Sequence, residues 1–503
     1  MPKNHVWVVL VALTACSPKP PASLPQSAAP ASVAPTLEPI EPLRAPFAMP
    51  ALERPRFPPH SVELPAFGGV AGGSQSNTEA FRRAIAELSR LGGGTLEVPA
   101  GVWLSGPIHL ASNIHLHVQR GAEIRFSQRF ADYLPAVFTR WEGIEVYNYS
   151  PLIYARDAEN VAVTGEGVLN GQGEAWWPWK KTQQPFAARL YQFAEQGTAV
   201  EQRVLAEEGG LRPSFLQTIS CKNVLVEGVT LRDGPMWTIH PVYSENVIVR
   251  RVRVETHGPN NDGCNPDSSR NVLIEDSFFS TGDDCIVLKS GLNEDGWRVA
   301  KPTENVVIRR IHGERGHGGV VIGSEMSGGV RNVYAHDSEF IGTDRGLRMK
   351  SMRGRGGVVE RIYYENVRHS GIRLLPVEIT TFYNASTLKP LTQTPPLIRD
   401  VFVRNLSSEG GQRALEIVGL PEQPIASVHF DNVTSSAEQG AHCVACQDVE
   451  FSNTHIAARI PPQFQIEKSS NIRVDRSCSN EGQCVSVDAE SRVSVDGNSP
   501  SPM

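Results

Sequence analysis

The phrase Asn-Val-Leu-Val at residues 223–226 returns as Asn-Val-Ile-Val at 246–249, as Asn-Val-Leu-Ile at 271–274 and as Asn-Val-Val-Ile at 305–308. The first three copies are 23 and 25 residues apart, and turns rich in Gly, Asn or Asp separate them. Short β-branched strands at a period in the low to mid twenties are typical of a solenoid. A leucine-rich repeat would need a Leu pattern and helices that are missing here, and a propeller would need a period near twice as long. The repeat therefore predicts an all-β fold, a parallel β-helix whose coils stack about 4.8 Å apart.

The recurring asparagine has a structural interpretation. We expect each Asn to lie at a turn and to stack on the Asn of the neighbouring coil, where it satisfies polar groups of the turn. A chemical role is disfavoured because the residue repeats along the whole solenoid.

Composition separates a leader from the body of the chain. Of the 37 prolines in the 503 residues, 13 lie between residues 17 and 60, a segment without an apolar period that predicts a disordered tether. The expected order is a tether at 17–60, a β-helix at 61–475 and a polar tail at 476–503. Because Asp and Glu (54) outnumber Lys and Arg (48), a basic nucleic-acid-binding protein is excluded as the default.

The N-terminus predicts export. Lys3 and His5 precede an apolar run at 6–13, which is too short to span a membrane but fits a secretory signal. The run ends in Leu13-Thr14-Ala15-Cys16, which resembles a bacterial lipobox. Residues 1–16 are then a signal peptide, Cys16 is lipidated, and several acyl chains on it would anchor the protein stably. Ser17 after the Cys favours an outer-membrane lipoprotein at the cell surface or in the periplasm. The alternative is an ordinary signal peptide with a chance Cys.

One helix is expected before the coils. Ser76 and Glu79 form a capping-box pattern, and a triple glycine at 92–94 ends the segment. Its apolar face consists of Phe81, Ile85, Leu88 and Leu91. Such a helix would cover the open first coil of the solenoid. A polar, partly helical insert at 182–210 interrupts the repeats, and insertions of this kind lie on one face of a solenoid, often the binding face.

Seven cysteines remain after Cys16. Cys443 and Cys446, and likewise Cys478 and Cys484, are close enough in sequence for local disulfides, which export permits. A zinc site built from these four is the alternative. We expect Cys264 and Cys285 to be buried packing residues or a disulfide rather than nucleophiles.

The densest polar cluster surrounds Asp262, in Asn260-Asn261-Asp262, and a second contains Asp283 and Asp284. Asp262 and Asp283 are 21 residues apart, roughly one coil, so we expect one to stack over the other. Ionising both carboxylates at close range is costly unless one takes a proton. Two carboxylates with separated pKa values are what the acid/base hydrolysis of a glycosidic bond requires. The alternatives are a calcium site and solvated turns.

Two further motifs follow the carboxylates. Gly316-His317-Gly318 places a His between glycines, where a ligand can approach closely. Arg348 and Lys350 are two residues apart and share a face if they lie on a strand. With Arg345, Arg353 and Arg355 they form a basic cluster. This cluster suggests an anionic ligand, and a solvated run of charges is the alternative.

These motifs together resemble glycoside hydrolase family 28, the polygalacturonase family of right-handed parallel β-helices. The family motif Asn-Thr-Asp appears as Asn260-Asn261-Asp262, Asp-Asp as Asp283-Asp284, Gly-His-Gly as 316–318, and Arg-Ile-Lys as Arg348-Met349-Lys350. The resemblance runs from about residue 65 to about residue 433. The changes at Asn261 and Met349 are expected to bear on substrate choice more than on chemistry.

The resemblance implies roles for the motif residues. Asp283 would be the general acid, and Asp262 and Asp284 would hold and activate the attacking water. His317 would support the protonation of the acid. The expected substrate-binding residues are Arg348 and Lys350, which would hold the uronate carboxylate, together with Asn260, Gly316 and Gly318.

The implied activity is the inverting hydrolysis of α-1,4-linked galacturonan, the backbone of pectin. The enzyme is expected to be a monomer that uses no cofactor and no metal. Rhamnogalacturonan and xylogalacturonan are alternative substrates. A lyase on the same fold and a non-catalytic pectin-binding protein are alternative functions. The insert at 182–210 and the residues after Gly291 could close one end of the groove, which favours exo action. Trp176, Trp177 and Trp179 are either a sugar-stacking wall or buried packing.

Overall fold

The structure is a computed structural model that describes residues 1, 3, 39–384, 390–391, 394–478 and 483–496. The chain divides into two compact units, Met1–Glu41 and Pro42–Met503, and the fold below is that of the second. Cys16 and the rest of the proposed signal peptide, apart from residues 1 and 3, lie outside the described residues. Within the described ranges, no helix combines the length and the apolar character needed to cross a membrane.

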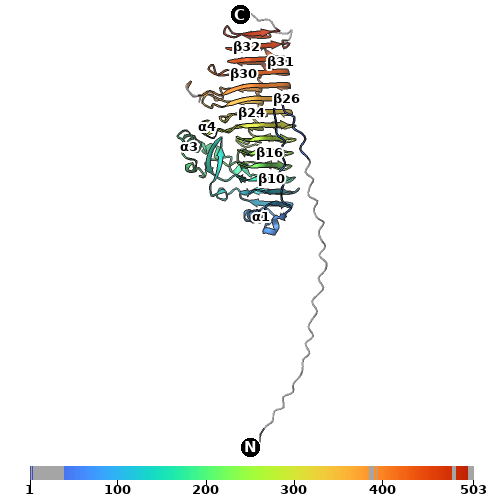
Figure 1. The fold of residues 1–503 in the computed structure, drawn as a ribbon, viewed down its shortest axis with the longest axis vertical. Helices are drawn as coiled ribbons and strands as arrows, with labels where there is room; N and C mark the ends of the chain where they lie inside the picture. Colours follow the sequence, from blue (N-terminus) through green and yellow to red (C-terminus); the bar gives the residue numbers. More distant parts are fainter. Residues whose placement is uncertain (2, 4–38, 385–389, 392–393, 479–482, 497–503) are drawn as a thin grey trace. The chain divides into compact units, whose positions relative to one another are not determined.

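Three stacks of parallel strands wind around a common core (Figure 1). The first stack contains, in order, β1 (Ser61–Glu63), β2 (Gly94–Val98), β5 (Ile114–Val118), β10 (Glu159–Gly165), β13 (Lys222–Glu227), β16 (Glu245–Arg250), β18 (Arg270–Glu275), β21 (Thr303–Arg309), β24 (Val330–Ile341), β26 (Val358–Ile372), β28 (Leu397–Gly410), β30 (Ile425–Val444), β31 (Cys446–Glu467), β32 (Ser470–Asp475) and β34 (Val493–Val495). The second contains β3 (Gly101–Ser105), β6 (Ala122–Phe126), β11 (Val168–Asn170), β14 (Thr230–Arg232), β17 (Arg253–Thr256), β19 (Phe278–Thr281) and β22 (His312–Arg315), and it merges into β24.

The third stack carries the predicted site motifs. It contains β4 (Ile108–Leu110), β9 (Ile153–Arg156), β12 (Leu216–Ile219), β15 (Ile239–Val242), β20 (Ile286–Leu288), β23 (Val320–Gly323), β25 (Arg345–Lys350), β27 (Leu375–Thr380), β29 (Arg413–Val418) and β33 (Val485–Val487), with the last parts of β30 and β31 between β29 and β33. Cys264 bridges Ile239 to Ile286 and so links β15 to β20. The predicted parallel β-helix is confirmed.

The core follows directly from the repeat. Val224 pairs with Val247, Val247 with Val272 and Val272 with Val306 in parallel register, and all four are buried. Each Val of the repeated phrase therefore packs on the Val of the coil below, and the coils bury one continuous apolar interior.

The preceding asparagines form the expected ladder. Asn223 has φ of 57° and donates from Nδ2 to Oδ1 of Asn160 at 3.0 Å. Asn332, with φ of 56°, donates in the same way to Asn305 at 2.9 Å. Asn tolerates this left-handed backbone better than most residues, so the repeat selects Asn for both the turn and the stack.

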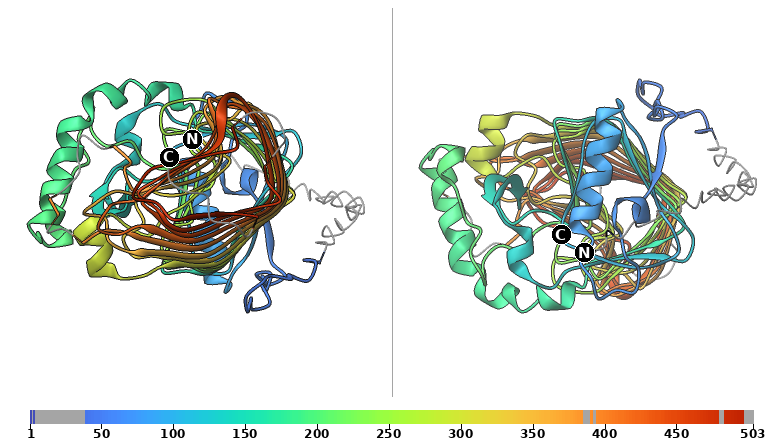
Figure 2. Two further views of the ribbon diagram at one scale, coloured as in Figure 1. Left: turned by 90° about the horizontal axis from the view of Figure 1, so that it is seen from above. Right: turned by 90° about the horizontal axis from the view of Figure 1, so that it is seen from below.

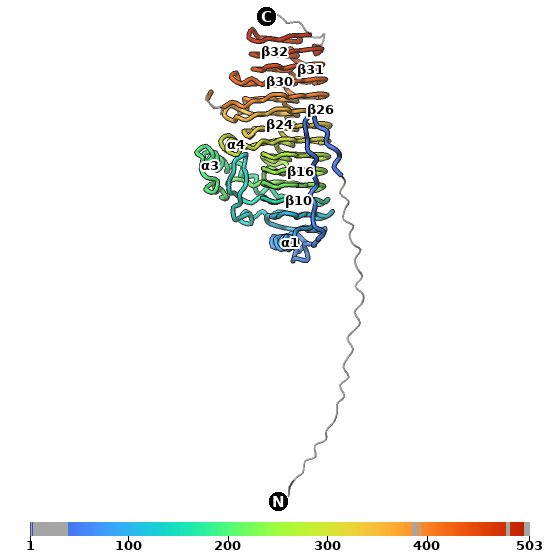
Figure 3. Tube along the Cα trace, viewed as in Figure 1, coloured from blue at the N-terminus to red at the C-terminus, as the bar shows by residue number. Residues whose placement is uncertain are grey.

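The predicted tether at 17–60 is wrong for its last part. Residues 42–60 run along the outer face of the first stack (Figure 3). The ring of Phe57 stacks on His115, the backbone of Glu53 exchanges two hydrogen bonds with the Asn246 side chain, and Arg54 pairs with Glu227 at 2.8 Å. We call residues 42–60 the strap.

The strap explains an apolar stripe on the outer face of the sheet. Ala162, Leu225, Ile248, Leu273 and Val307 alternate with the core valines, so they point outward, and yet each is at most 1% exposed. Half-buried strap residues alternate with exposed ones in the order Leu43, Ala45, Phe47 and Met49. The proline content obscured this short period-two pattern, in which Phe47 contacts Tyr363 of β26, while Glu53, Arg54 and Phe57 fasten the strap alongside the stripe.

The expected helix is α1 (Thr78–Arg90), which contacts β1, β2, β4 and β5 (Figure 2). The capping box is wrong. Asn77 is the N-cap, and its side chain bonds the backbone of Val70, Gln75 and Leu104 instead of the helix. Phe81, Ile85 and Leu88 are buried as expected, whereas Leu91 is 37% exposed because it lies just beyond the last helical turn. The role of α1 as a cap of the first coil stays a prediction.

Shorter elements surround the third stack. β7 (Val137–Trp141) and β8 (Ile144–Asn148) form an antiparallel hairpin. α2 (Trp179–Thr182) leads into the insert, which contains α3 (Gln184–Glu195) and η4 (Val200–Gln202). α4 (Asn293–Val299) follows β20. The remaining short turns of helix are η1 (Leu64–Phe67), η2 (Phe130–Tyr133) and η3 (Gly173–Ala175).

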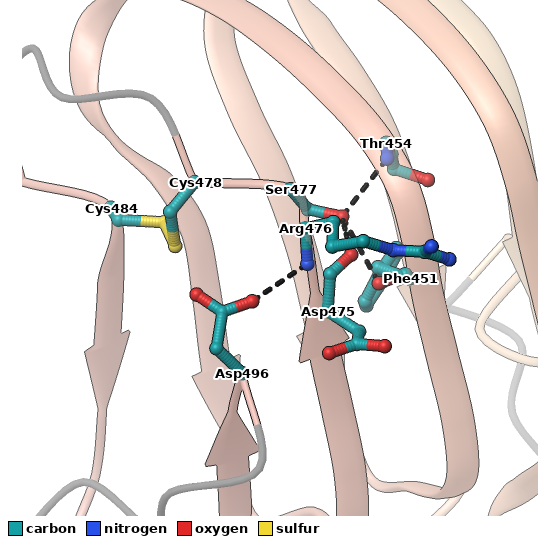
Figure 4. The surroundings of a disulfide bond; sticks show 8 residues. All are labelled: Phe451, Thr454, Asp475, Arg476, Ser477, Cys478, Cys484 and Asp496. Carbon is teal, nitrogen blue, oxygen red and sulfur yellow. Dashed lines mark hydrogen bonds between the residues drawn. A yellow bond between two sulfur atoms is a disulfide. The ribbon is translucent and has the colours of Figure 1, made fainter.

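The C-terminal coils hold the cysteine pairs. Cys478 and Cys484 form a disulfide (Figure 4), which excludes the alternative of a four-cysteine zinc site. Cys443 and Cys446 are buried free thiols, so the second expected local bridge is absent. The parallel sheet also continues past the boundary placed at residue 475, since β33 and β34 pair with β31 and β32.

Candidate active site

The four motifs lie on successive coils of the third stack. Asp262 comes two residues before the bridge at Cys264, and Asp283 and Asp284 come directly before β20. His317 comes shortly before β23, and Arg348 and Lys350 lie on β25. Because Ile286 pairs with Val320 and Val320 with Leu347, these segments stand side by side on one face of the sheet.

The register between the first two motifs differs by one residue from the expected one. Cys264 pairs with Ile286 and Asp267 with Lys289, so the coil is 22 residues long at this point rather than 21. In this register Asp262 is aligned with Asp284 instead of Asp283. Cys264 and Cys285 are both buried free thiols, as the packing interpretation required.

Asp262 is a buried carboxylate, 3% exposed, whose Oδ2 accepts a hydrogen bond from Asn265 Nδ2 at 2.7 Å. Burial raises the pKa of Asp262 well above its usual value, and the negative charge of Asp283 raises it further. Two carboxylates at close range disfavour double ionisation, which is why the charge of Asp283 acts on the pKa of Asp262.

Asp283 is paired with His317, whose Nδ1 lies 3.0 Å from Asp283 Oδ1. Burial acts to raise the pKa of Asp283, but the hydrogen bond with His317 and the charge of Lys350 outweigh it and lower the pKa to about 2. The same hydrogen bond raises the pKa of His317. The hydrogen bond therefore favours the charged form of both partners.

Asp284 is buried and accepts a hydrogen bond at Oδ2 from Lys350 Nζ at 2.8 Å. Its Oδ1 is buried without a hydrogen-bond partner among the described residues. A Cβ at Gly318 would lie 3.1 Å from this oxygen, and a Cβ at Gly316 would lie 2.5 Å from the backbone oxygen of Asp283. Both glycines let the His317 turn pack against the carboxylates, and the structure assigns them this packing role.

A sequence model described as glycosyl hydrolases family 28 matches residues 91–457. The chain belongs to glycosyl hydrolase family 28. It is 32% identical over 408 residues to a probable polygalacturonase of Vitis vinifera, and the match covers 78% of each chain. It is 26% identical over 433 residues to an exo-poly-alpha-D-galacturonosidase of Dickeya chrysanthemi, and the match covers 78% of this chain and 70% of that protein. It is also similar to the crystal structure of a hyperthermoactive exopolygalacturonase from Thermotoga maritima, with a TM-score of 0.75, 43% identity and coverage of 80% of this chain and 91% of that one. The protein is therefore a glycoside hydrolase of the polygalacturonase family.

The basic cluster of this family 28 enzyme is less cationic than the sequence suggested. Arg345 and Arg348 both pair with Glu378, at 2.5 and 2.6 Å, and Arg353 pairs with Glu422. The Arg348 guanidinium also lies 5.3 Å from the ring centre of Tyr383. The carboxylate partners come from later coils, so the sequence of the cluster alone could not show the neutralisation.

Asn260 is held by two cations that sequence reasoning missed. Its Oδ1 accepts hydrogen bonds from Lys180 Nζ and from Arg212 Nη2, both at 2.7 Å. Arg212 is buried, and burial lowers its pKa to about 10 while the charges of Glu142, Asp262 and Asp283 oppose the shift. Lys180 and Arg212 flank the insert, and nothing in their own sequence surroundings marks them.

A second missed pair is Lys289 and Glu325, whose side chains form a buried ion pair at 2.6 Å. Burial acts to lower the pKa of Lys289, but the charges of Glu325 and Asp262 outweigh it and raise the pKa. Lys289 thus extends the positive charge beneath Asp262 and Asp284. Alternation along β20 could have indicated that Lys289 points away from the core, but not which carboxylate it meets.

The two departures from the family motifs do not face a substrate. The Asn261 side chain is fully buried and bonds Thr256 and the backbone of Gly258, Gly234 and Met236. Met349 is fully buried in the core. Both side chains therefore stabilise the coil behind the site, and their expected influence on substrate choice stays a prediction.

Two of the three tryptophans near the insert are buried packing residues, and the third is half-buried. Trp176 and Trp179 are buried and make ring contacts with each other and with Phe130 and Tyr149, so they are packing residues. Trp177 is half-buried and donates from Nε1 to the backbone oxygen of Gly234 at 2.9 Å.

Proposed function

We propose that this family 28 enzyme hydrolyses α-1,4-linked galacturonan with inversion of configuration. The observation that carries the proposal is the convergence of Asp262, Asp283 and Asp284 with His317 and Lys350 on successive coils. Two carboxyl groups whose pKa values are shifted in opposite directions supply the two roles of an acid/base hydrolysis. The neighbouring Arg348 and Lys350 supply the positive charge that a uronate requires, and a uronate polymer is what the names of the relatives indicate.

In this mechanism Asp283 protonates the leaving oxygen while Asp262 and Asp284 position a water on the opposite side of the sugar. Asp283 must carry a proton when the substrate is bound, and Asp262 then accepts a proton from the attacking water. A proton transfer from Asp262 to Asp283 restores the starting state, so the cycle is balanced. His317 acts as the positioning residue that holds Asp283 and exchanges a proton with it.

The test of these roles is Asp283→Asn, which preserves shape and removes the acid. General acid catalysis contributes typically 10²–10⁴-fold to the rate, so the variant should lose about that much of kcat on polygalacturonate. The matched control is Asp276→Asn, which alters an Asp paired with Arg310 at 2.5 Å on the first coil stack. Full activity in Asp283→Asn would remove Asp283 from its role.

Exo action is the second part of the proposal. The insert is fastened across the third stack to the segment after β20, because Arg203 forms a buried ion pair with Asp295 of α4 at 2.7 Å and α3 contacts α4. Tyr191 of α3 also donates to Glu142 of the β7–β8 hairpin at 2.8 Å. We infer that this arch closes one end of the substrate path, so that the enzyme releases short products from a chain end.

The product profile on polygalacturonate tests the arch. An exo enzyme releases a single small product from the first time points, whereas an endo enzyme releases a mixture of oligomers. The names of the Dickeya and Thermotoga relatives support the first outcome. An early mixture of oligomers would refute exo action without affecting the hydrolase assignment.

We also propose that the enzyme is an exported, monomeric outer-membrane lipoprotein. The support is the apolar run at 6–13 followed by Leu13-Thr14-Ala15-Cys16. Replacing Cys16 by Ala should abolish the incorporation of radiolabelled palmitate and move the protein from the membrane fraction to the soluble fraction. Incorporation that persists in the variant would exclude Cys16 as the lipidated residue.

A further inference from the structure

Arg355 is the member of the basic cluster for which the described residues provide no carboxylate partner. Its Nη1 donates to Asn293 Oδ1 at 2.7 Å, and its backbone oxygen accepts a hydrogen bond from Trp297 Nε1. The Nε atom is buried without a hydrogen-bond partner in the described part of the chain, and Nη2 has none there either. Every other Arg or Lys of the cluster has a carboxylate within 2.8 Å.

This arrangement is energetically unfavourable without a ligand. A partly buried charge and an unpaired N–H each cost free energy unless a partner satisfies them. Burial accordingly lowers the pKa of Arg355. Asn293 and Trp297, both on α4, bind the guanidinium and the backbone of Arg355 respectively, and the Nε edge of the guanidinium stays unpaired.

The contacts of Arg355 place it against α4, the element that pairs with Arg203 of the insert. The charges of Glu325 and of the Tyr191 and Tyr383 side chains act on it. Glu325 is in turn influenced by both Arg355 and Lys350, and Tyr191 belongs to α3 of the arch. Arg355 therefore follows Lys350 closely in the chain and contacts α4, on the side that the arch is proposed to close.

We propose that Arg355 binds the carboxylate of a second uronate, the sugar next to the one that Arg348 and Lys350 hold and on the side of the insert. The inference rests on the proposed galacturonan hydrolysis. The Nε and Nη2 edge of a guanidinium matches both oxygens of a carboxylate. Glu142, whose Oε2 accepts from Tyr191, supplies acceptor oxygens for the hydroxyls of the same sugar. Arg355 thereby makes the enzyme prefer a substrate whose chain end carries an ionised uronate.

A double-mutant cycle between enzyme and substrate tests this role. The substrates are trigalacturonate and its two terminal monomethyl esters, and the enzymes are the wild type and Arg355→Gln. One of the two esters should be a poorer substrate of the wild type than trigalacturonate by about 10- to 100-fold in kcat/KM, the value of a charge-assisted hydrogen bond. Arg355→Gln should slow trigalacturonate by the same factor and leave the rate on that ester unchanged.

The unchanged rate on the ester shows at the same time that the variant is folded. Arg353→Gln is the matched control, because Arg353 lies two residues away and is paired with Glu422, and it should preserve the wild-type preference. Equal losses on all three substrates in Arg355→Gln would overturn the proposal, since they indicate a structural role. A wild-type enzyme that cleaves none of the three would instead refute the proposed hydrolase function, which separates the two failures.

Discussion

Asp295 of α4 provides a direct test of the arch, because its side chain bonds both Arg203 of the insert and the backbone of β8. It is buried, 1% exposed, and accepts hydrogen bonds from Arg203 Nη1 at 2.7 Å and from the backbone nitrogen of Glu145 at 3.0 Å. Arg298 also pairs with it at 3.0 Å. The substitution Asp295→Ala removes all three contacts.

The expected cost follows from the burial of Arg203, whose side chain is 2% exposed. Removing one partner of a buried ion pair leaves an uncompensated charge and costs about 3–5 kcal/mol. Because each coil of a solenoid contacts only its neighbours, the loss should be concentrated in the insert and α4 rather than spread over the stack. The insert should then open about 10²–10³ times more often, since 1.4 kcal/mol corresponds to a factor of ten.

Two measurements on the same variant decide the matter. Hydrogen exchange of the amides of 184–203 should accelerate by about this factor, and the products from polygalacturonate should change from one small species to mixed oligomers. Glu304→Ala is the control, since Glu304 pairs with the half-exposed Arg331 and contributes about 0–1 kcal/mol. If exchange accelerates while the product profile stays that of the wild type, the arch does not cause exo action.

Three further outcomes are expected. Because the pKa of His317 is raised in the folded protein, its ion pair with Asp283 stabilises the fold fully below the unfolded-state pKa of about 6.5. This stabilisation is lost as the pH rises through the folded-state pKa. A plot of kcat against pH should fall on the same alkaline side, and His317→Ala should abolish that fall. Lys350→Met leaves the buried Asp284 unpaired and should lower the free energy of unfolding in urea by about 3–5 kcal/mol, with a loss of kcat. Deleting residues 42–60 should lower the melting temperature and cause aggregation, monitored by light scattering, because it uncovers the apolar stripe under the strap. A deletion variant as stable and soluble as the full chain would show that the strap covers nothing.

The repeat and the motifs could be predicted from the sequence because each is defined by residues that are close together in the chain. A Val after an Asn at 223, 246 and 271 is sufficient to predict a stacked core, and the coil stacking is confirmed. The ion-pair partners of the site residues could not be predicted in this way. Lys350 meets Asp284 across 66 residues and Arg140 meets Asp267 across 127, and no local pattern encodes such pairs. The one-residue error in the register arose because coil length varies from turn to turn.

Composition misled the interpretation of the strap for a physical reason that applies to other solenoids. Proline prevents helix formation and removes a hydrogen-bond donor, but it favours the extended backbone that a strap along stacked strands requires. The outward apolar residues at Leu225, Ile248 and Leu273 are the stronger signal, because a solvated sheet face has no reason to carry them at three successive coils. An unexplained apolar stripe on the outside of a β-helix therefore predicts a covering segment, and the nearest candidate is a proline-rich stretch with apolar residues at every second position. In this chain the strap satisfies that condition from Leu43 to Met49, which is why the tether must be shorter than its proline content indicates.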